Sequence, residues 1–324
     1  MAIIQTVLGE IDSADLGFTL AYEHLFSDLT TRAPEELKAI FESFKKDNVG
    51  ETVEELMLYR QANGNAVVDM TPYGVDVIDR PQKLAEAARQ TGIHIVCGSA
   101  FYTASSWTEE ERGMSIQEIA DLYISDIVNG FGSTGIKPGV IGEIGVSNPI
   151  EACEEKSLKA AAQASLVTGL TISVHPGSIE ESPAMIVKIL TDYGVRQDKI
   201  IIGHMSTTFA PDRLADLLAF ADMGTYFAFD QFATPERNYQ SIGRPYWSDE
   251  EGVRAIRFLC EAGFRDKILI SCDEINTMLN VGKGGPGYIY IPNVIVPMMR
   301  AQGIPETDIH AITVENPAKA FAIG

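Results

Sequence analysis

The sequence has few cysteines and few basic residues for its length. Only four of its 324 residues are cysteines, and no two of them have the CxxC spacing. Four are too few for a disulfide scaffold in so long a chain, so we expect free thiols in a reducing compartment, the cytoplasm. Lys and Arg number 25 against 45 Asp and Glu, which gives a formal net charge of −20. So acidic a chain offers no basic surface for phosphates, which argues against a nucleic-acid-binding protein.

Long hydrophobic runs are also absent. No apolar stretch reaches the roughly 20 residues of a membrane-spanning helix, and residues 1–5 (MAIIQ) lack the basic region and apolar stretch of a signal peptide. With 45% hydrophobic and 22% charged residues, the composition is that of a globular protein. No Pro- or Ser-rich linker divides the chain, so we predict one domain over residues 1–324 that binds neither membrane nor nucleic acid.

What the sequence does contain is a regular alternation of short β-branched runs and amphipathic segments. Eight strands are predicted, at residues 18–23, 66–69, 93–97, 140–143, 171–174, 200–203, 225–229 and 268–271. Apolar residues at three- and four-residue spacing predict helices at residues 82–90, 116–128, 155–166, 184–193, 213–221 and 251–262. Glycines follow several of these segments, as they do at helix carboxyl ends.

The strands are apolar at nearly every position, as in IHIVCG, GVIGEIG and KIIIGH. Such strands are buried on both faces, which is typical of a parallel sheet covered by helices. Eight strands that alternate with helices favour an α/β fold of the closed (β/α)8 TIM-barrel type. No G-x-G-x-x-G turn follows the first strand, which disfavours a dinucleotide-binding sheet.

Polar side chains collect where these strands end, and the active sites of such barrels lie at that edge. The residues at the strand ends are Tyr22, His24, Glu143, His175, His204 and Asp273. Three of the five histidines and two carboxylates therefore meet at one rim. Imidazole and carboxylate groups that converge in a cleft are how proteins hold divalent transition metals, so the sequence predicts a metal site there.

Other polar residues near the strands have a structural interpretation as well as a functional one. Asp69 ends the second strand, where it either contacts substrate or, as we favour, caps a neighbouring loop or helix. Asp230 after the seventh strand is equally open to both interpretations. His94 opens its strand at the opposite end of the barrel and His310 lies near the carboxyl terminus, so neither is expected to bind metal. Strand alternation should turn Cys272 away from the site.

The strand-end motifs resemble those of phosphotriesterase-like proteins in the amidohydrolase superfamily. The resemblance is carried by residues 19–25 (TLAYEHL), 92–98 (GIHIVCG), 141–145 (IGEIG), 173–177 (SVHPG), 202–204 (IGH), 269–273 (LISCD) and 315–318 (ENPA). It runs from about Thr6 to Phe321 and is strongest to the phosphotriesterase homology protein branch. In that branch a glutamate, here Glu143, stands where other members have a carboxylated lysine.

The resemblance implies a centre of two metals, usually zinc, with Mn²⁺ or Co²⁺ as alternatives. His24 and Asp273 would hold the more buried ion, His175 and His204 the more exposed ion, and Glu143 would bridge them. A bridging hydroxide would be the nucleophile, and Asp273 would accept its proton. The resemblance also implies a homodimer.

Tyr22 departs from the family's opening His-x-His motif, since it takes the first histidine's place. A phenol with an ordinary pKa near ~10 must lose its proton to bind a metal, whereas a neutral imidazole is a ready ligand. Three outcomes stay open: a two-metal site with Tyr22 as a ligand, a single ion at the exposed position, or a site without catalysis.

The loops offer candidates for substrate binding in Phe26, Tyr102, Arg244 and Trp247, whose side chains suit an apolar or anionic ligand. We predict a metal-dependent hydrolase of a small molecule that acts on a lactone, carboxylic ester or amide, with the lactone favoured by analogy. Slow hydrolysis of organophosphate triesters would accompany this activity. The alternatives are a non-catalytic metal- or ligand-binding homologue and a single-metal lyase or decarboxylase.

Overall fold

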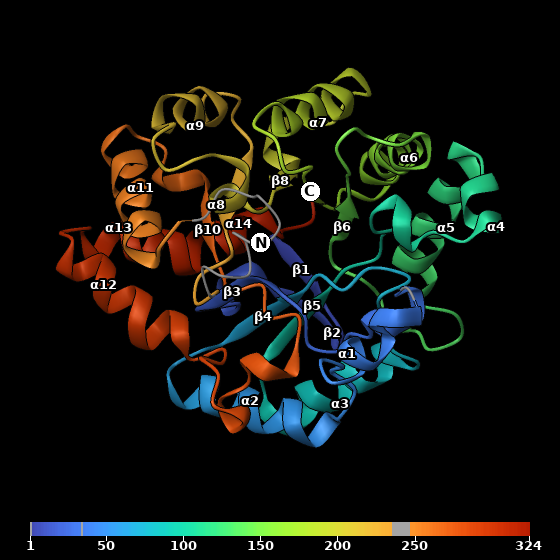
Figure 1. Cartoon of the computed structure of the whole chain (residues 1–324), viewed down its shortest axis with the longest axis horizontal. Helices are drawn as coiled ribbons and strands as arrows, with labels where there is room; N and C mark the ends of the chain where they lie inside the picture. The colour runs from blue at the N-terminus through green and yellow to red at the C-terminus, as the bar shows by residue number, and fades with distance from the viewer. Residues whose placement is uncertain (1, 34, 235–246) are drawn as a thin grey trace.

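The computed structural model describes residues 2–33, 35–234 and 247–324, and its centre is a ring of parallel strands (Figure 1). The ring consists of β3 (Thr19–Glu23), β4 (Ala66–Asp69), β5 (His94–Cys97), β6 (Ile141–Gly145), β7 (Ile172–His175), β8 (Ile200–Ile202), β9 (Tyr226–Phe229) and β10 (Ile268–Ile270). All eight predicted strands are confirmed, with ends that shift by one or two residues.

Hydrogen bonds close the ring at two places where the strands are less regular. The amide of Gly139 donates to the carbonyl of Cys97 at 2.9 Å, which joins β5 to β6. The amide of Asp273 donates to the carbonyl of Tyr22 at 3.2 Å, which joins the last strand to the first. Between these points β3, β4 and β5 pair in parallel, as do β6 through β10 in chain order. The predicted (β/α)8 barrel is therefore confirmed.

Helices cover the outside of the ring (Figure 1). The longer helices are α2 (Val49–Gln61), α3 (Arg80–Thr91), α5 (Ile116–Asn129), α6 (Ala152–Thr168), α7 (Glu181–Asp192), α9 (Leu214–Ala221) and α11 (Asp249–Glu261). The shorter helices are α1 (Lys38–Glu42), α4 (Glu109–Gly113), α8 (Met205–Thr208), α12 (Val296–Ala301), α13 (Glu306–His310) and α14 (Asn316–Ala320). Ser115 and Ser248 begin α5 and α11 with capping boxes, each with a glutamate three residues later. None of the helices among the described residues is long and apolar enough to cross a bilayer.

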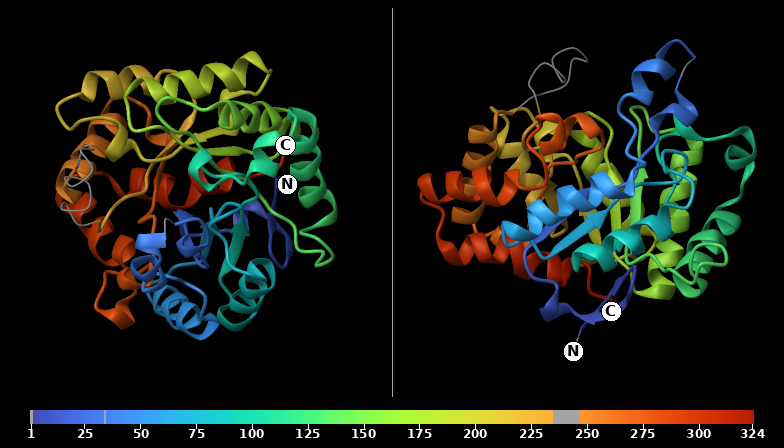
Figure 2. Two further views of the ribbon diagram at one scale, coloured as in Figure 1. Left: turned by 45° about the vertical axis from the view of Figure 1, so that its right-hand side comes forward. Right: turned by 90° about the horizontal axis from the view of Figure 1, so that it is seen from below.

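A hairpin that the sequence patterns did not reveal closes the amino end of the barrel. It consists of β1 (Ile3–Thr6) and β2 (Gly9–Asp12), which pair antiparallel. Figure 2 shows both chain termini at this end and α1 at the opposite end. Ile4 and Leu16 are fully buried and pack with residues that point into the barrel. The hairpin thus seals one end, so only the carboxyl ends of the strands are left to form a mouth.

Apolar side chains fill both faces of the strands. Val68, Val96 and Ile201 belong to a cluster inside the ring, whereas Val67 and Ile95 belong to the larger cluster between ring and helices. Because successive side chains of a strand point to opposite faces, near-continuous apolar runs are what this double burial requires.

Candidate metal centre

The five residues expected to bind metal converge at the mouth of the barrel, around the carboxylate of Glu143. Its Oε1 lies 3.3 Å from Nε2 of His24, and its Oε2 lies 3.4 Å from Nδ1 of His175. Nε2 of His24 is also 3.2 Å from Oδ1 of Asp273. Nε2 of His204 lies 2.6 Å from Nδ1 of His175. Side chains from β6, β7 and the turns after β3, β8 and β10 therefore face one common space.

Three of these residues form a compact donor set. Among the described residues, Glu143, His175 and His204 offer ligand atoms that all lie within 4.8 Å of one another. Two imidazoles and a carboxylate at this spacing match the three-protein-ligand arrangement of catalytic zinc sites, in which a further position stays open. The donor set therefore fits the divalent metal that the sequence predicts.

Irregular backbone places the donors. The pairing of β3 with β4 shifts register between Leu20 and Glu23, and that of β6 with β7 shifts between Ile141 and Ile144. Such irregularities re-aim side chains, and here they occur on the two strands that carry Tyr22 and Glu143.

Two of the predicted ligands have left-handed backbone conformations. His204 has φ +61° and Asp273 has φ +52°. Residues other than glycine rarely adopt such angles, and they persist where surrounding contacts enforce them, often at functional sites. Gly203, before His204, leaves little room for a side chain, because a Cβ there would lie 3.0 Å from both the Tyr22 ring and the Asp230 carboxylate.

Tyr22 lies under this centre as a hydrogen-bond donor. Its side chain is fully buried, and its hydroxyl donates to Oε2 of Glu143 at 2.5 Å. Burial, followed by the negative charge of Glu143, raises the pKa of Tyr22 well above its ordinary value. The structure therefore shows Tyr22 supporting the central carboxylate.

Two of the histidines are held from behind. Nδ1 of His204 lies 3.0 Å from Oδ1 of Asp230, and the His204 amide also donates to that carboxylate. Nδ1 of His24 lies 3.0 Å from Oγ1 of Thr71. Asp230, which the sequence left ambiguous, therefore belongs to the site and orients His204.

Asp69 has the capping role that the sequence favoured. Its carboxylate accepts from the amides of Thr71 at 2.9 Å and Leu25 at 3.3 Å, and from Arg80 at 3.1 Å. Asp69 therefore fixes the backbone on both sides of the His24–Thr71 contact.

The electrostatics of the mouth favour a cation. Burial alone would lower the pKa values of the histidines, but the hydrogen bonds of His24 to Asp273 and Glu143 raise its pKa to about 10. The charge of Asp230 likewise outweighs burial and raises the pKa of His204 to about 9. Despite burial, the neighbouring histidines hold the pKa values of Glu143 and Asp273 below the ordinary range. The negative charge of the carboxylates thus dominates the electrostatics of the site. Without a metal, this charge favours protonated imidazoles, and a metal would compete with those protons for the ring nitrogens.

Glu23, which ties the ends of β3 and β10 together, was not among the residues predicted from the sequence. Its carboxylate accepts from the Ser271 hydroxyl at 2.7 Å and from the amides of Cys272 and Glu274 at 2.8 Å each. Burial and the nearby Glu274 raise its pKa to about 8. The available signal was a single acidic residue, Glu23, at the end of an otherwise uncharged strand. Through these bonds Glu23 fixes His24 and Asp273 relative to each other.

The residues predicted to bind substrate are scattered. Tyr102 is half-buried, and its hydroxyl lies 3.4 Å from Nδ1 of His175, at the centre itself. Phe26 is fully buried in the main core, so the structure does not support its expected contact with substrate. Arg244 lies outside the described residues.

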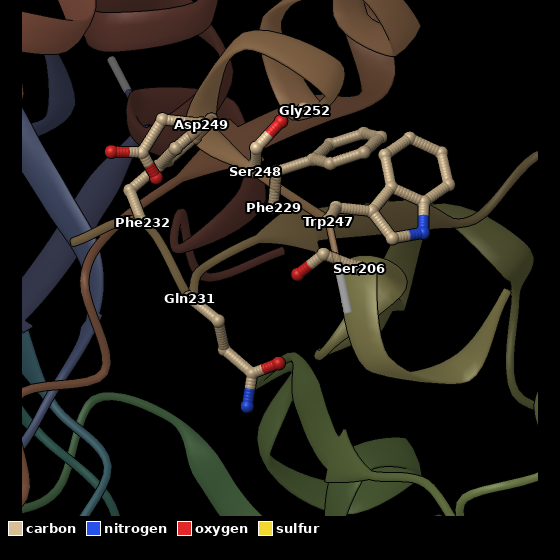
Figure 3. Close-up of a pocket in the computed structure, with 8 residues that line it drawn as sticks. All are labelled: Ser206, Phe229, Gln231, Phe232, Trp247, Ser248, Asp249 and Gly252. Atoms are coloured by element: carbon tan, nitrogen blue, oxygen red, sulfur yellow. The ribbon is translucent and has the colours of Figure 1, made fainter. Parts of the chain in front are cut away.

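Trp247 is 5% exposed and donates from Nε1 to the carbonyl of Phe209 at 2.6 Å. It lines a small cavity with Phe229 and Ser206, and Figure 3 shows its indole beside the Phe229 ring. The side chain of Gln231 points away from this aromatic pair (Figure 3). The local packing of Trp247 is therefore that of a core residue that borders a cavity.

The cysteines are free thiols, as the sequence predicted. All four cysteines are free, and Cys97, Cys153 and Cys272 are buried. His310 is exposed and His94 is half-buried at the sealed end of the barrel, so neither approaches the centre.

Comparisons with known proteins agree over nearly the whole chain. The model of the Phosphotriesterase family matches residues 2–321. An N-acetyltaurine hydrolase of Danio rerio is 33% identical over 98% of this chain and 97% of its own length. A resiniferatoxin-binding protein of Rhodobacter sphaeroides is 29% identical with a TM-score of 0.90, and the match covers 99% of this chain and 95% of that one. The phosphotriesterase homology protein of Escherichia coli, solved with phosphate in its active site, is 26% identical with a TM-score of 0.83, over 95% and 99% of the two chains.

Proposed function

The chain belongs to the phosphotriesterase family of hydrolases, and from that premise we propose that it cleaves the amide bond of a small N-acylated substrate. The observation that carries this proposal is the convergence of Glu143, His175 and His204, with His24 and Asp273 beside them. Such a set of nitrogen and oxygen donors suits one or two divalent ions, with Zn²⁺ the first expectation and Mn²⁺ or Co²⁺ as alternatives.

The donor set assigns a role to each side chain. Glu143, His175 and His204 would hold an outer ion, and His24 and Asp273, together with Glu143, would hold an inner ion. When bound, the metal would supply an activated water and a Lewis acid for the substrate carbonyl. Tyr22 would keep the Glu143 carboxylate in place through its 2.5 Å hydrogen bond.

We infer that Asp273 moves the proton. Its side chain is 18% exposed against 3% for Glu143, so it is the carboxylate that faces the open mouth. In the hydrolysis the oxygen of water joins the acyl carbon and the carbon–nitrogen bond breaks. Asp273 would accept the proton from the attacking water and return it to the departing amine. Tyr102, beside His175, would contact the acyl group from the loop after β5.

An amide substrate is supported ahead of the lactone that sequence analogy favoured. The curated relatives that match 97–98% of this chain at 33–35% identity are named N-acetyltaurine hydrolases. A substrate of that kind has a short acyl group on the nitrogen of an amine that also carries an acidic group. We therefore propose N-acetylated amino acids or amino sulfonates as the substrate class, with lactones, esters and organophosphate triesters as slower alternatives.

The proposal is tested with protein purified without chelator. Elemental analysis should return about one to two metal equivalents per chain, the range of known hydrolytic zinc sites. The loaded protein should hydrolyse N-acetyltaurine and N-acetylated amino acids with a higher kcat/KM than a panel of γ-lactones, aryl esters and paraoxon. A metal content near zero that added metal does not change would refute the proposal. Faster turnover of a lactone than of every amide would refute the substrate assignment alone.

A further inference from the structure

We propose that the two halves of this centre bind divalent cations with unequal affinity, and that the outer half fills first. The outer half is Glu143, His175 and His204, and the inner half is His24, Asp273 and the same Glu143. This inference rests on the proposed metal centre, which it deepens by assigning an order of occupancy.

The two halves differ in the number of imidazole donors. The outer half has a carboxylate and two imidazoles with ligand atoms within 4.8 Å of one another. In the inner half a single imidazole, that of His24, lies between carboxylate oxygens at 3.2 and 3.3 Å. Imidazole nitrogen is a strong ligand for zinc-like ions, so the half with two imidazoles should bind more tightly.

Tyr22 on β3 could add a ligand atom to the inner half, but its hydroxyl is oriented toward Glu143. Its hydroxyl donates to Oε2 of Glu143, so its hydrogen is aimed at the carboxylate. The bond fixes the Glu143 carboxylate, whose Oε2 also lies 3.4 Å from Nδ1 of His175. Tyr22 therefore supports the shared carboxylate without adding a ligand to the inner half.

His204 and His24 also differ in the group that contacts Nδ1, on the ring edge away from the metal-facing nitrogen. His204 has the buried carboxylate of Asp230 at 3.0 Å from Nδ1, and its own amide donates to both oxygens of that carboxylate. Among the residues that the structure describes, the partner of His24 at Nδ1 is the neutral hydroxyl of Thr71, at 3.0 Å. A carboxylate behind an imidazole raises its basicity and fixes its tautomer, and such partners change metal affinity by about 10- to 100-fold. The outer histidine is therefore the better-supported ligand.

The experiment is a titration of chelator-treated protein with Zn²⁺ by calorimetry, with Co²⁺ absorption spectra as a second readout of coordination. Wild-type protein should take up the ion in two steps whose dissociation constants differ by at least about 10-fold. Tyr22→His adds an imidazole beside the inner position and should bring the second step close to the first. The matched control Tyr22→Phe removes the hydroxyl without adding a donor and should leave the second step weak.

The outcomes separate this inference from the proposed function. Two equal steps in the wild-type protein, or a weak step that Tyr22→His leaves unchanged in a variant with native circular dichroism, would overturn the inference and leave the metal centre intact. If Tyr22→His does not fold, the ratio of the two steps in the wild-type protein decides. An absence of Zn²⁺ binding in the wild-type protein would overturn the metal centre itself.

Discussion

Histidines at the two ends of this barrel have pKa values shifted in opposite directions. At the mouth, His24 and His204 lie against carboxylates, which raise their pKa values to about 10 and 9. At the sealed end, His94 is half-buried beside Arg60, and burial and that positive charge lower its pKa. The mouth has left-handed residues and paired charges, whereas the sealed end has the hairpin and apolar contacts of Ile4 and Leu16. Position in the barrel therefore decides whether a histidine becomes a cation site or a packing residue.

This contrast implies a division of labour between the ends. Changes at the mouth should alter metal content and turnover more than folding, and changes at the sealed end should do the reverse. Variants at matched buried positions can test the expectation for each end.

The largest effect is expected from Glu143→Gln. The substitution removes the central carboxylate that faces both His24 and His175, so metal should be lost and kcat/KM should fall by at least about 10³-fold. Metal content and turnover of a cleavable amide are the measurements.

Glu154→Gln is the matched control for that variant. Glu154 is as buried as Glu143, but it accepts from the amides of Ala104 and Ser147, in the loops after β5 and β6, and not from a predicted metal ligand. Its replacement should lower the thermal midpoint and leave the metal content unchanged. Equal metal loss in both variants would show that Glu143 acts through the fold, contrary to its place at the centre.

A cavity at the sealed end should have the opposite profile. Ile4→Ala removes a fully buried side chain from the cluster inside the ring and should cost about 3 kcal/mol. The thermal midpoint should fall by roughly 5–10 °C, while metal content and the KM of folded protein stay at wild-type values. A fall in metal content at a temperature where the variant is folded would break the division between the two ends.

The sequence patterns predicted the barrel well because each strand is buried on both faces. Runs such as KIIIGH carry that information locally, and the strand-end donors His204 and Asp273 follow from it. The hairpin β1–β2 was missed because its strands are four residues each and partly exposed, so they lack the apolar signal.

Contacts between distant residues were beyond the sequence. The bond between Tyr22 and Glu143 joins residues 121 positions apart, and that between His204 and Asp230 joins residues 26 apart. Aromatic residues near strand ends were equally ambiguous. Phe26 is buried in the core between ring and helices, whereas Tyr102 reaches His175, and no local pattern separates the two. Side-chain partners are set by the tertiary fold, which is why the donors were predictable and their supports were not.

The smallest effect should appear in the pH dependence of stability in chelator-treated protein. His24 and His204 have folded pKa values of about 10 and 9, above the ordinary 6.5, so their stabilising contribution is complete below pH 6.5. That contribution is lost as the pH rises through 9 to 10, because the folded protein then holds protons that the unfolded chain has released. Stability should therefore decline gradually over this range. Thermal midpoints measured from pH 6.5 to 10 should show this decline, and Zn²⁺-loaded protein should lose less, since the metal replaces the protons.

His94→Asn should leave the decline unchanged, because the lowered pKa of His94 places its titration at lower pH. If the decline disappears in that variant, the histidines at the mouth are not its source, and the electrostatic contrast between the two ends fails.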